Sequence, residues 1–521
     1  MKGLSAVIGM AVTPLISAAV AYPGDWTAHQ PDQDSLGVKQ MMIGTASYFY
    51  TVAETFTGFY TTIKDQSGGF IKYAEIDKST GELVPSRFIV GRDDPVANNV
   101  PERVLEEPDV IEKKCLKSPY CSWKREHDGV SGSAPSGKYK NLVVPFKFSD
   151  HSGRDLNVDA LDELFNGKKL SVKDYFETQS YNKITMINEF APETVISRTE
   201  SYCADNASGL STVVHECLAE ALAGKNTDGY DTITFVHSGY GAEYGNQDEY
   251  DTYFDDRLWS HSWDIDATEY SGRYALISAY FGMENSRVNR VGAAVHEIGQ
   301  AMGAPTQYGE YPGHGLGYYD AMANPWGFDG TLYHCGSMSA YTKALLGWVD
   351  VEEITADGTR AIAASSISNK VYMISKGFPM DEYLLIENRE ATGYDKGLRQ
   401  PGLAIYHIDP SANNKAGHPD DGVYPANHYT VALIQADGRF DLEKSEDHGD
   451  MGDLFHHDRF AGFGPDGPLG PEGSVLSERG GHPNTNAYRG GVLTETGVTI
   501  SGISMASSEM SFSVTFEVTS S

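Results

Sequence analysis

The sequence is short of positive charge. Its 40 Lys and Arg residues face 72 Asp and Glu residues, which gives a formal net charge of -32. Proteins that bind nucleic acids neutralise phosphates with basic side chains, so this balance argues against a nucleic-acid partner. An excess of carboxylates favours solubility and the binding of divalent cations instead.

Long hydrophobic runs are also lacking. After residue 21, the sequence contains no stretch of about 18 apolar residues, which is the length needed to cross a bilayer. The one apolar run, Leu4–Val20, follows Lys2, is interrupted by Pro14 and ends in the cleavage signal Ala19-Val20-Ala21. We therefore expect residues 1–21 to be a signal peptide. The mature protein is expected to be secreted and extracellular, without a membrane span.

Cysteine is scarce: there are five, an odd number. In an exported protein, cysteines that lie close in sequence are candidates for local bridges. We expect Cys115 to pair with Cys121, and Cys203 with Cys217. Cys335 is then left over, and we expect it to be a buried apolar thiol.

Two common catalytic or binding motifs are missing. The serines near Ser260 and Ser337 lack the Gly-x-Ser-x-Gly context of a serine hydrolase. The Gly-rich segments 313–317 and 464–473 lack the Lys-Ser/Thr that follows a phosphate-binding loop. A serine nucleophile and a phosphate ligand are not indicated.

The chain does contain part of a metal-binding motif, in the segment 291–309. His296 and Glu297 open the His-Glu-x-x-His pattern, in which two imidazoles at positions i and i+4 share one face of a helix and bind zinc. The Glu of that pattern acts as general base on the zinc-bound water. The fifth position here is Gln300, which makes zinc binding the central question.

The pattern of elements predicts an α+β protein with several regions. Residues 22–136 read as an N-terminal region, a possible pro-segment or a separate module, which ends in a Gly/Ser/Pro-rich linker. Strands alternate with helices over 137–350, which predicts an α/β layer whose last helix carries the site. Short alternating runs over 351–521 predict a β-sandwich-like C-terminal domain.

An ordered series of motifs resembles the immune inhibitor A family of secreted zinc metallopeptidases. The match covers about three quarters of the chain and consists of His237–Glu243, Trp259–Trp263, His296–Pro305, Tyr319–Met322, Ser339–Trp348, Glu387–Arg389, Gly402–Asp409, Gln435–Asp437, Gly449–Phe455 and Pro483–Asn486. The resemblance implies a metzincin-like α/β peptidase domain with an active-site helix. It also implies a protein or peptide substrate and a zinc-activated water that hydrolyses the peptide bond.

The resemblance implies a ligand set that this chain keeps only in part. The family pattern His-Glu-x-x-His-x-x-Gly-x-x-Asp places zinc ligands at His296, Gln300 and Thr306, with Glu297 as the base. Gly303 and the methionine of the turn beneath the site (Met322) are retained. Each lost ligand costs roughly 3 kcal/mol, or about a hundredfold in zinc affinity. We therefore expect an impaired or inactive peptidase.

Two alternatives stay open at this point. Other residues could fill the vacant ligand positions, the candidates being Glu310, His314 and His334, so that a weak or rearranged peptidase site survives. The other alternative is a non-catalytic pseudopeptidase that binds peptides or a protein through the retained groove. The remaining histidines of the motif series, His237 and His261, are expected in packing or supporting roles.

A carboxylate-rich stretch follows in the C-terminal region. Its members are Asp441, Glu443, Glu446, Asp447, Asp450, Asp453 and Asp458. A solvated acidic surface is the leading interpretation of such a run. Calcium is the second, because several carboxylates on a Gly-containing turn suit a hard, oxygen-seeking cation.

Overall fold

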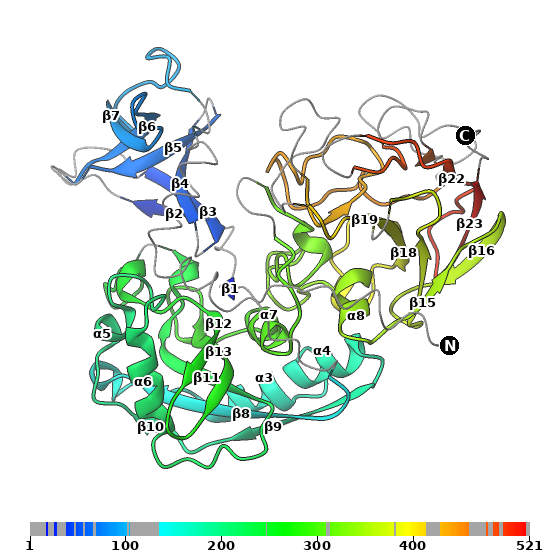
Figure 1. Ribbon diagram of the computed structural model, residues 1–521. Coiled ribbons are helices and arrows are strands. Elements are labelled where there is room, and N and C mark those ends of the chain that lie inside the picture. Colours follow the sequence, from blue (N-terminus) through cyan, green and yellow to red (C-terminus); the bar gives the residue numbers. More distant parts are fainter. Residues whose placement is uncertain are drawn as a thin grey trace.

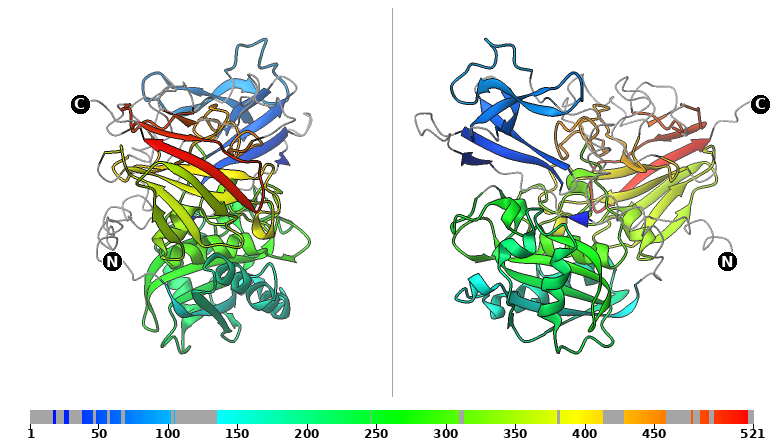
Figure 2. Two further views of the ribbon diagram at one scale, coloured as in Figure 1. Left: turned by 90° about the vertical axis from the view of Figure 1, so that its right-hand side faces the viewer. Right: turned by 60° about the vertical axis from the view of Figure 1, so that its left-hand side comes forward.

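The computed structural model describes residues 17–18, 25–28, 38–45, 48–55, 58–65, 69–101, 104, 135–245, 247–308, 313–379, 382–412, 428–457, 476–477, 483–488 and 493–516. These residues form a mixed α+β structure built largely from sheets, as the sequence predicted. Three bodies of secondary structure follow one another along the chain (Figure 1). In the turned views of Figure 2, the N-terminal and C-terminal strands both lie above the central α/β layer.

The N-terminal sheet is an antiparallel meander that lies within the predicted region 22–136. Its strands are β2 (Asp25–Ala28), β3 (Val38–Thr45), β4 (Tyr48–Thr55), β5 (Gly58–Lys64), β6 (Ile71–Ile76) and β7 (Leu83–Ile89), paired in chain order. Ala53, Tyr60, Ile71 and Tyr73 form a small core of its own. The predicted bridge between Cys115 and Cys121 lies outside the described residues, as does most of the predicted signal peptide.

The central sheet is mostly parallel. It comprises β8 (Gly137–Lys147), β9 (Ile184–Phe190), β10 (Thr194–Val195), β11 (Thr232–Tyr240), β12 (His261–Asp266), β13 (Ser271–Phe281) and β14 (Arg287–Val288). Strands β9, β8, β11 and β13 run parallel, whereas β12 is antiparallel to β13. The outer edge of β12 is paired with β1 (Ser17–Ala18), also antiparallel.

Helices cover both faces of this sheet. One face carries α3 (Val158–Asn166), α4 (Val172–Gln179) and α7 (Val291–Ala301), and the other carries α5 (Glu200–Ala204) and α6 (Val213–Leu222). Along β8 the side chains alternate, so Val143 joins the first core while Leu142 and Val144 join the second. This is the two-sided burial expected of a parallel strand.

Short 3-10 turns connect these elements. They are η1 (Ser149–His151), η2 (Ala242–Tyr244), η3 (Phe254–Asp256), η4 (Gly317–Tyr319) and η5 (Gly393–Asp395). None of the helices in the described part of the chain is long and apolar enough to span a bilayer.

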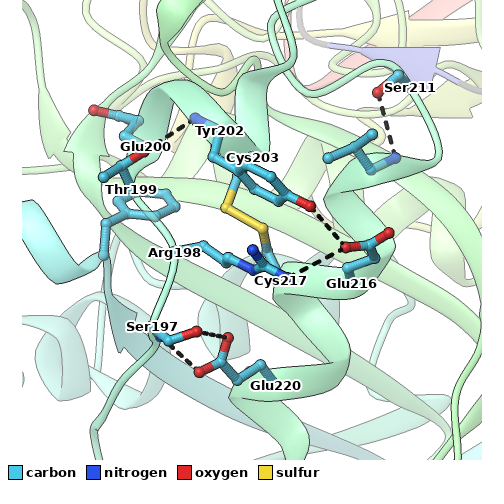
Figure 3. The surroundings of a disulfide bond; sticks show 12 residues. Ser197, Arg198, Thr199, Glu200, Tyr202, Cys203, Ser211, Glu216, Cys217 and Glu220 are labelled. Atoms are coloured by element: carbon cyan, nitrogen blue, oxygen red, sulfur yellow. Dashed lines mark hydrogen bonds and ion pairs between the residues drawn. A yellow bond between two sulfur atoms is a disulfide. The ribbon is translucent and has the colours of Figure 1, made fainter.

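A disulfide joins Cys203 in α5 to Cys217 in α6, which confirms the predicted pairing (Figure 3). Beside it, Glu216 accepts a hydrogen bond from the Tyr202 hydroxyl at 2.9 Å. Cys335 is a buried free thiol, as predicted, and burial raises its pKa.

The C-terminal strands form two sheets that share one core. The first contains β15 (Asp350–Glu353), β17 (Lys370–Ile374), β18 (Tyr383–Arg389), β19 (Gly402–Ile408) and β20 (Val431–Leu433). The second contains β16 (Gly358–Ala363), β21 (Leu476–Ser477), β22 (Val498–Ser501) and β23 (Glu509–Phe516). Met510, Phe512 and Val514 point from β23 into the shared core, which confirms the predicted period of two.

Helix α8 (Ala340–Leu345) attaches the C-terminal sheets to the central layer. Lys343 of α8 lies 3.0 Å from Glu387 of β18, and both side chains are fully buried. Arg389 pairs with Asp395 at 2.7 Å and donates to the carbonyl of Tyr319. Buried charges are tolerated only when they are paired and hydrogen-bonded, and this network meets that condition.

Candidate functional site

Helix α7, which carries the His-Glu motif, is buried on all sides. Every residue from Val291 to Gln300 is buried, because α7 lies between the central sheet and the segment around Met322. Glycine permits this approach: a Cβ on Gly299 would lie 2.7 Å from the sulfur of Met322. Met322 therefore lies directly against the helix.

His296 is held at both ring nitrogens. Its Nδ1 lies 2.7 Å from the carbonyl oxygen of Ala321, and its Nε2 lies 2.8 Å from the side-chain Nε2 of Gln300. Burial lowers the pKa of His296 to about 4, so the ring is neutral. A carbonyl can only accept, so Nδ1 carries the proton and Nε2 accepts from the Gln300 amide.

The other motif residues lie as follows. Glu297 is 0% exposed. Gly303 has a φ of 97°, the left-handed backbone that the motif requires of a glycine after the helix. Thr306 is half-buried in the segment that follows. The ring of Tyr308, which sequence reasoning did not single out, stacks on His296 with ring centroids 6.2 Å apart.

Two of the three candidate replacement ligands lie in contact with residues outside α7. The ring of His314 packs against that of His448 in the C-terminal region, with centroids 3.7 Å apart and the planes tilted by 35°. His334 lies 2.8 Å from Asp329. Glu310 lies outside the described residues.

Among the residues that the structure describes, those at α7 do not supply a zinc site. The Nε2 lone pair of His296 accepts a hydrogen bond from Gln300, and an amide N–H group is not a ligand. In the described ranges, the only cluster of three or more His, Cys, Asp or Glu side chains with ligand atoms within 4.8 Å of one another is Asp437, Asp441 and Asp450.

Two members of this acidic cluster, Asp441 and Asp450, belong to the predicted carboxylate-rich stretch. Asp437, which lies just before the stretch, joins Asp441 and Asp450 within 4.8 Å. Burial, with Asp447 and Glu446 nearby, raises the pKa of Asp441 to about 6. The neighbouring carboxylate of Asp453 accepts from the Tyr319 hydroxyl, while Glu443 accepts from Gln435. Asp458 lies outside the described residues.

A second group of buried polar residues lies at the carboxyl ends of β8 and β11. Glu200 stands 3.5 Å from Nε2 of His151 and 3.7 Å from Nδ1 of His237, and its side chain is 2% exposed. Burial is the main reason that the pKa of Glu200 is raised to about 8. Sequence reasoning missed Glu200 and His151, because they belong to no motif.

His237 and His261 take the packing roles expected of them. His237 accepts from the backbone N–H of Gly239 at 3.1 Å. His261 lies 2.8 Å from both the Trp259 carbonyl and the Tyr274 hydroxyl. Both rings are fully buried, so they support the fold around the site.

Comparison with known proteins finds no matching family model and no matching curated protein. The resemblance to the immune inhibitor A family therefore rests on the sequence motifs alone.

Proposed function

We propose that this chain is a secreted, peptidase-like protein of the immune inhibitor A type that binds an extended peptide or protein segment without hydrolysing it. The observation that carries the proposal is the hydrogen bond from Gln300 to Nε2 of His296 at 2.8 Å. It uses the lone pair through which the family's first zinc ligand would bind the metal.

Loss of hydrolysis follows from the ligand chemistry. Peptide-bond hydrolysis in the resembled family needs a metal-polarised water, which the Glu of the motif deprotonates. With Gln300 and Thr306 in place of two ligands, zinc affinity falls by about ten-thousandfold. Glu297 then has no activated water to act on. In this proposal the metzincin-like layer and the β-sandwich-like C-terminal sheets are retained as a scaffold.

The edge of β12 supports a binding role. This strand ends the central sheet and packs against α7, so a segment paired with it lies beside the former catalytic helix. The chain's own Ser17–Ala18 pairs there, opposite Ser262 and His261. Cleavage after Ala21 would remove that segment and present the edge to another one. Extended peptides commonly bind by adding a strand to such an edge.

The test uses the secreted chain, purified and analysed for zinc, and run on a casein zymogram with and without a chelator. We expect no zinc that the His296→Gln change removes, and no chelator-sensitive cleavage. Fluorescent casein fragments should still bind, and they should slow hydrogen exchange at the amides of residues 261–266. Glu297→Gln should bind these fragments as well as the unmodified protein does.

One tightly held zinc per molecule together with chelator-sensitive cleavage would show instead that a rearranged peptidase site is active. Absence of peptide binding would remove the binding role and leave only the loss of hydrolysis.

A further inference from the structure

A small cavity of about 20 Å³ lies in the C-terminal region, beside β19, β20 and the segment 483–488. Four polar side chains line it: His407, Gln435, Glu443 and Asn484. Their exposed fractions are 0%, 3%, 6% and 4%. A cavity of this size holds one water molecule or one ion.

The His407 ring is oriented by a carboxylate. Its Nε2 lies 2.7 Å from Oε1 of Glu382, and the backbone N–H of Tyr488 donates to the same oxygen. In the neutral ring, Nε2 then carries the proton and Nδ1 carries the lone pair. Nδ1 is buried and has no hydrogen-bond partner among the residues that the structure describes. Metal-binding histidines are typically held in this way, with the second nitrogen donating to a carboxylate.

Glu443 is positioned in a similar manner. The side-chain Nε2 of Gln435 donates to its Oε2 at 2.7 Å, and Oε1 of Gln435 accepts from the backbone N–H of Asp441. Both polar atoms of the Gln435 side chain are thus hydrogen-bonded, so Gln435 orients the Glu443 carboxylate. The cavity therefore brings together an imidazole, a carboxylate and the amide of Asn484, all on well-supported side chains.

We propose that this cavity binds one divalent first-row transition-metal ion, with Nδ1 of His407 and the Glu443 carboxylate as ligands and the Asn484 amide oxygen beside them. The imidazole selects zinc-like ions over calcium and magnesium, which prefer oxygen ligands. At α7 the imidazole lone pair is already used by Gln300, whereas His407 lines the cavity and its Nδ1 has no hydrogen-bond partner among the described residues. The proposal does not depend on the function assigned to α7.

The experiment titrates the metal-free full-length protein with Zn²⁺ by calorimetry and with Co²⁺ by absorption spectroscopy. We expect one ion per chain, with a Co²⁺ spectrum that includes a nitrogen ligand. His407→Gln and Glu443→Gln should each weaken binding at least about a hundredfold. Glu382→Gln, which keeps both ligands, should weaken it about ten- to a hundredfold.

His428→Gln is the matched control. His428 is also a buried imidazole held by a carboxylate, Asp409 at 2.9 Å, but it does not line the cavity. This variant and His296→Gln should bind Zn²⁺ like the unmodified protein. If the unmodified chain binds neither ion at millimolar concentration, the cavity holds only water and the proposal is wrong. Binding that survives His407→Gln would also overturn it, and the Glu382→Gln variant decides the matter if His407→Gln does not fold.

Discussion

Gln300 donates its side-chain amide N–H to Nε2 of His296 at 2.8 Å, across one turn of α7. With the carbonyl of Ala321 at Nδ1, both nitrogens of a fully buried ring are satisfied. A buried polar group costs free energy unless it is hydrogen-bonded, so Gln300 stabilises the buried ring of His296.

Restoring the family ligands should restore the metal site. Gln300→His together with Thr306→Asp frees the Nε2 lone pair of His296 and supplies the two missing ligands. We expect elemental analysis to find one more zinc per molecule in this variant than in the unmodified protein.

The control for that variant adds His296→Gln to the two changes, and the zinc content should then return to that of the unmodified protein. If the double variant binds no additional zinc, the scaffold around α7 is not the one that the resemblance implies.

Glu200→Gln should change the pH dependence of stability. Because the pKa of Glu200 is raised from 4.5 to about 8, its burial favours the protonated form, and the stability of the unmodified protein falls as pH rises through that window. The variant cannot ionise, so it should gain about 1.4 kcal/mol relative to the unmodified protein for each pH unit between 4.5 and 8. Urea unfolding at several pH values measures the difference.

The charged groups around Glu200 are Arg154, Arg257, Asp248 and Asp150, with His151 and His237 in contact. Glu216→Gln is the control, since Glu216 lies on α6 and makes an exposed ion pair with Arg198. Such pairs contribute about 0–1 kcal/mol, so this variant should follow the unmodified protein. If the difference in free energy of unfolding between Glu200→Gln and the unmodified protein does not change with pH, the Glu200 carboxyl titrates normally.

Calcium should raise the melting temperature through Asp437, Asp441 and Asp450. The like charges of these carboxylates destabilise the folded chain, and a bound calcium ion would neutralise them. At ten times its dissociation constant, an ion that binds only the folded state adds about 1.4 kcal/mol. Thermal unfolding in chelator and in millimolar calcium measures the effect.

Asp450→Asn should remove most of that shift, and magnesium should reproduce little of it. An unchanged melting temperature in the unmodified protein would exclude calcium, leaving a half-buried acidic cluster whose members lie 3.7–3.9 Å from the Arg439 guanidinium.

Removing the disulfide should destabilise the α5–α6 pair. Cys203 and Cys217 are 14 residues apart, and a bridge across such a loop contributes about 3 kcal/mol. We expect Cys203→Ser with Cys217→Ser to lower the free energy of unfolding by that order. A reducing agent should lower the stability of the unmodified protein by about that much more than it lowers that of the variant; equal stability of the two oxidised proteins would contradict the expectation.

Local features of the fold were readable from the sequence. The shared helix face of positions 296 and 300 in α7 and the alternation of β23 depend on residues close together in the chain, so they follow the periods of helix and strand. The Cys203–Cys217 bridge also follows from proximity in sequence. Glu200 was missed because its partners, His151 and His237, are distant in sequence and meet only when β8 and β11 lie side by side.

The sequence by itself determined that Gln300 shares a helix face with His296, because four residues make about one helical turn. Only the tertiary structure decided which ring nitrogen of His296 accepts from Gln300. The Ala321 carbonyl, 25 residues away in sequence, lies at Nδ1 and leaves Nε2 as the acceptor. The same holds for His407, whose orientation depends on Glu382 on a neighbouring segment. The chemistry of a buried imidazole is set by the groups that packing brings to it, and those come from distant parts of the chain.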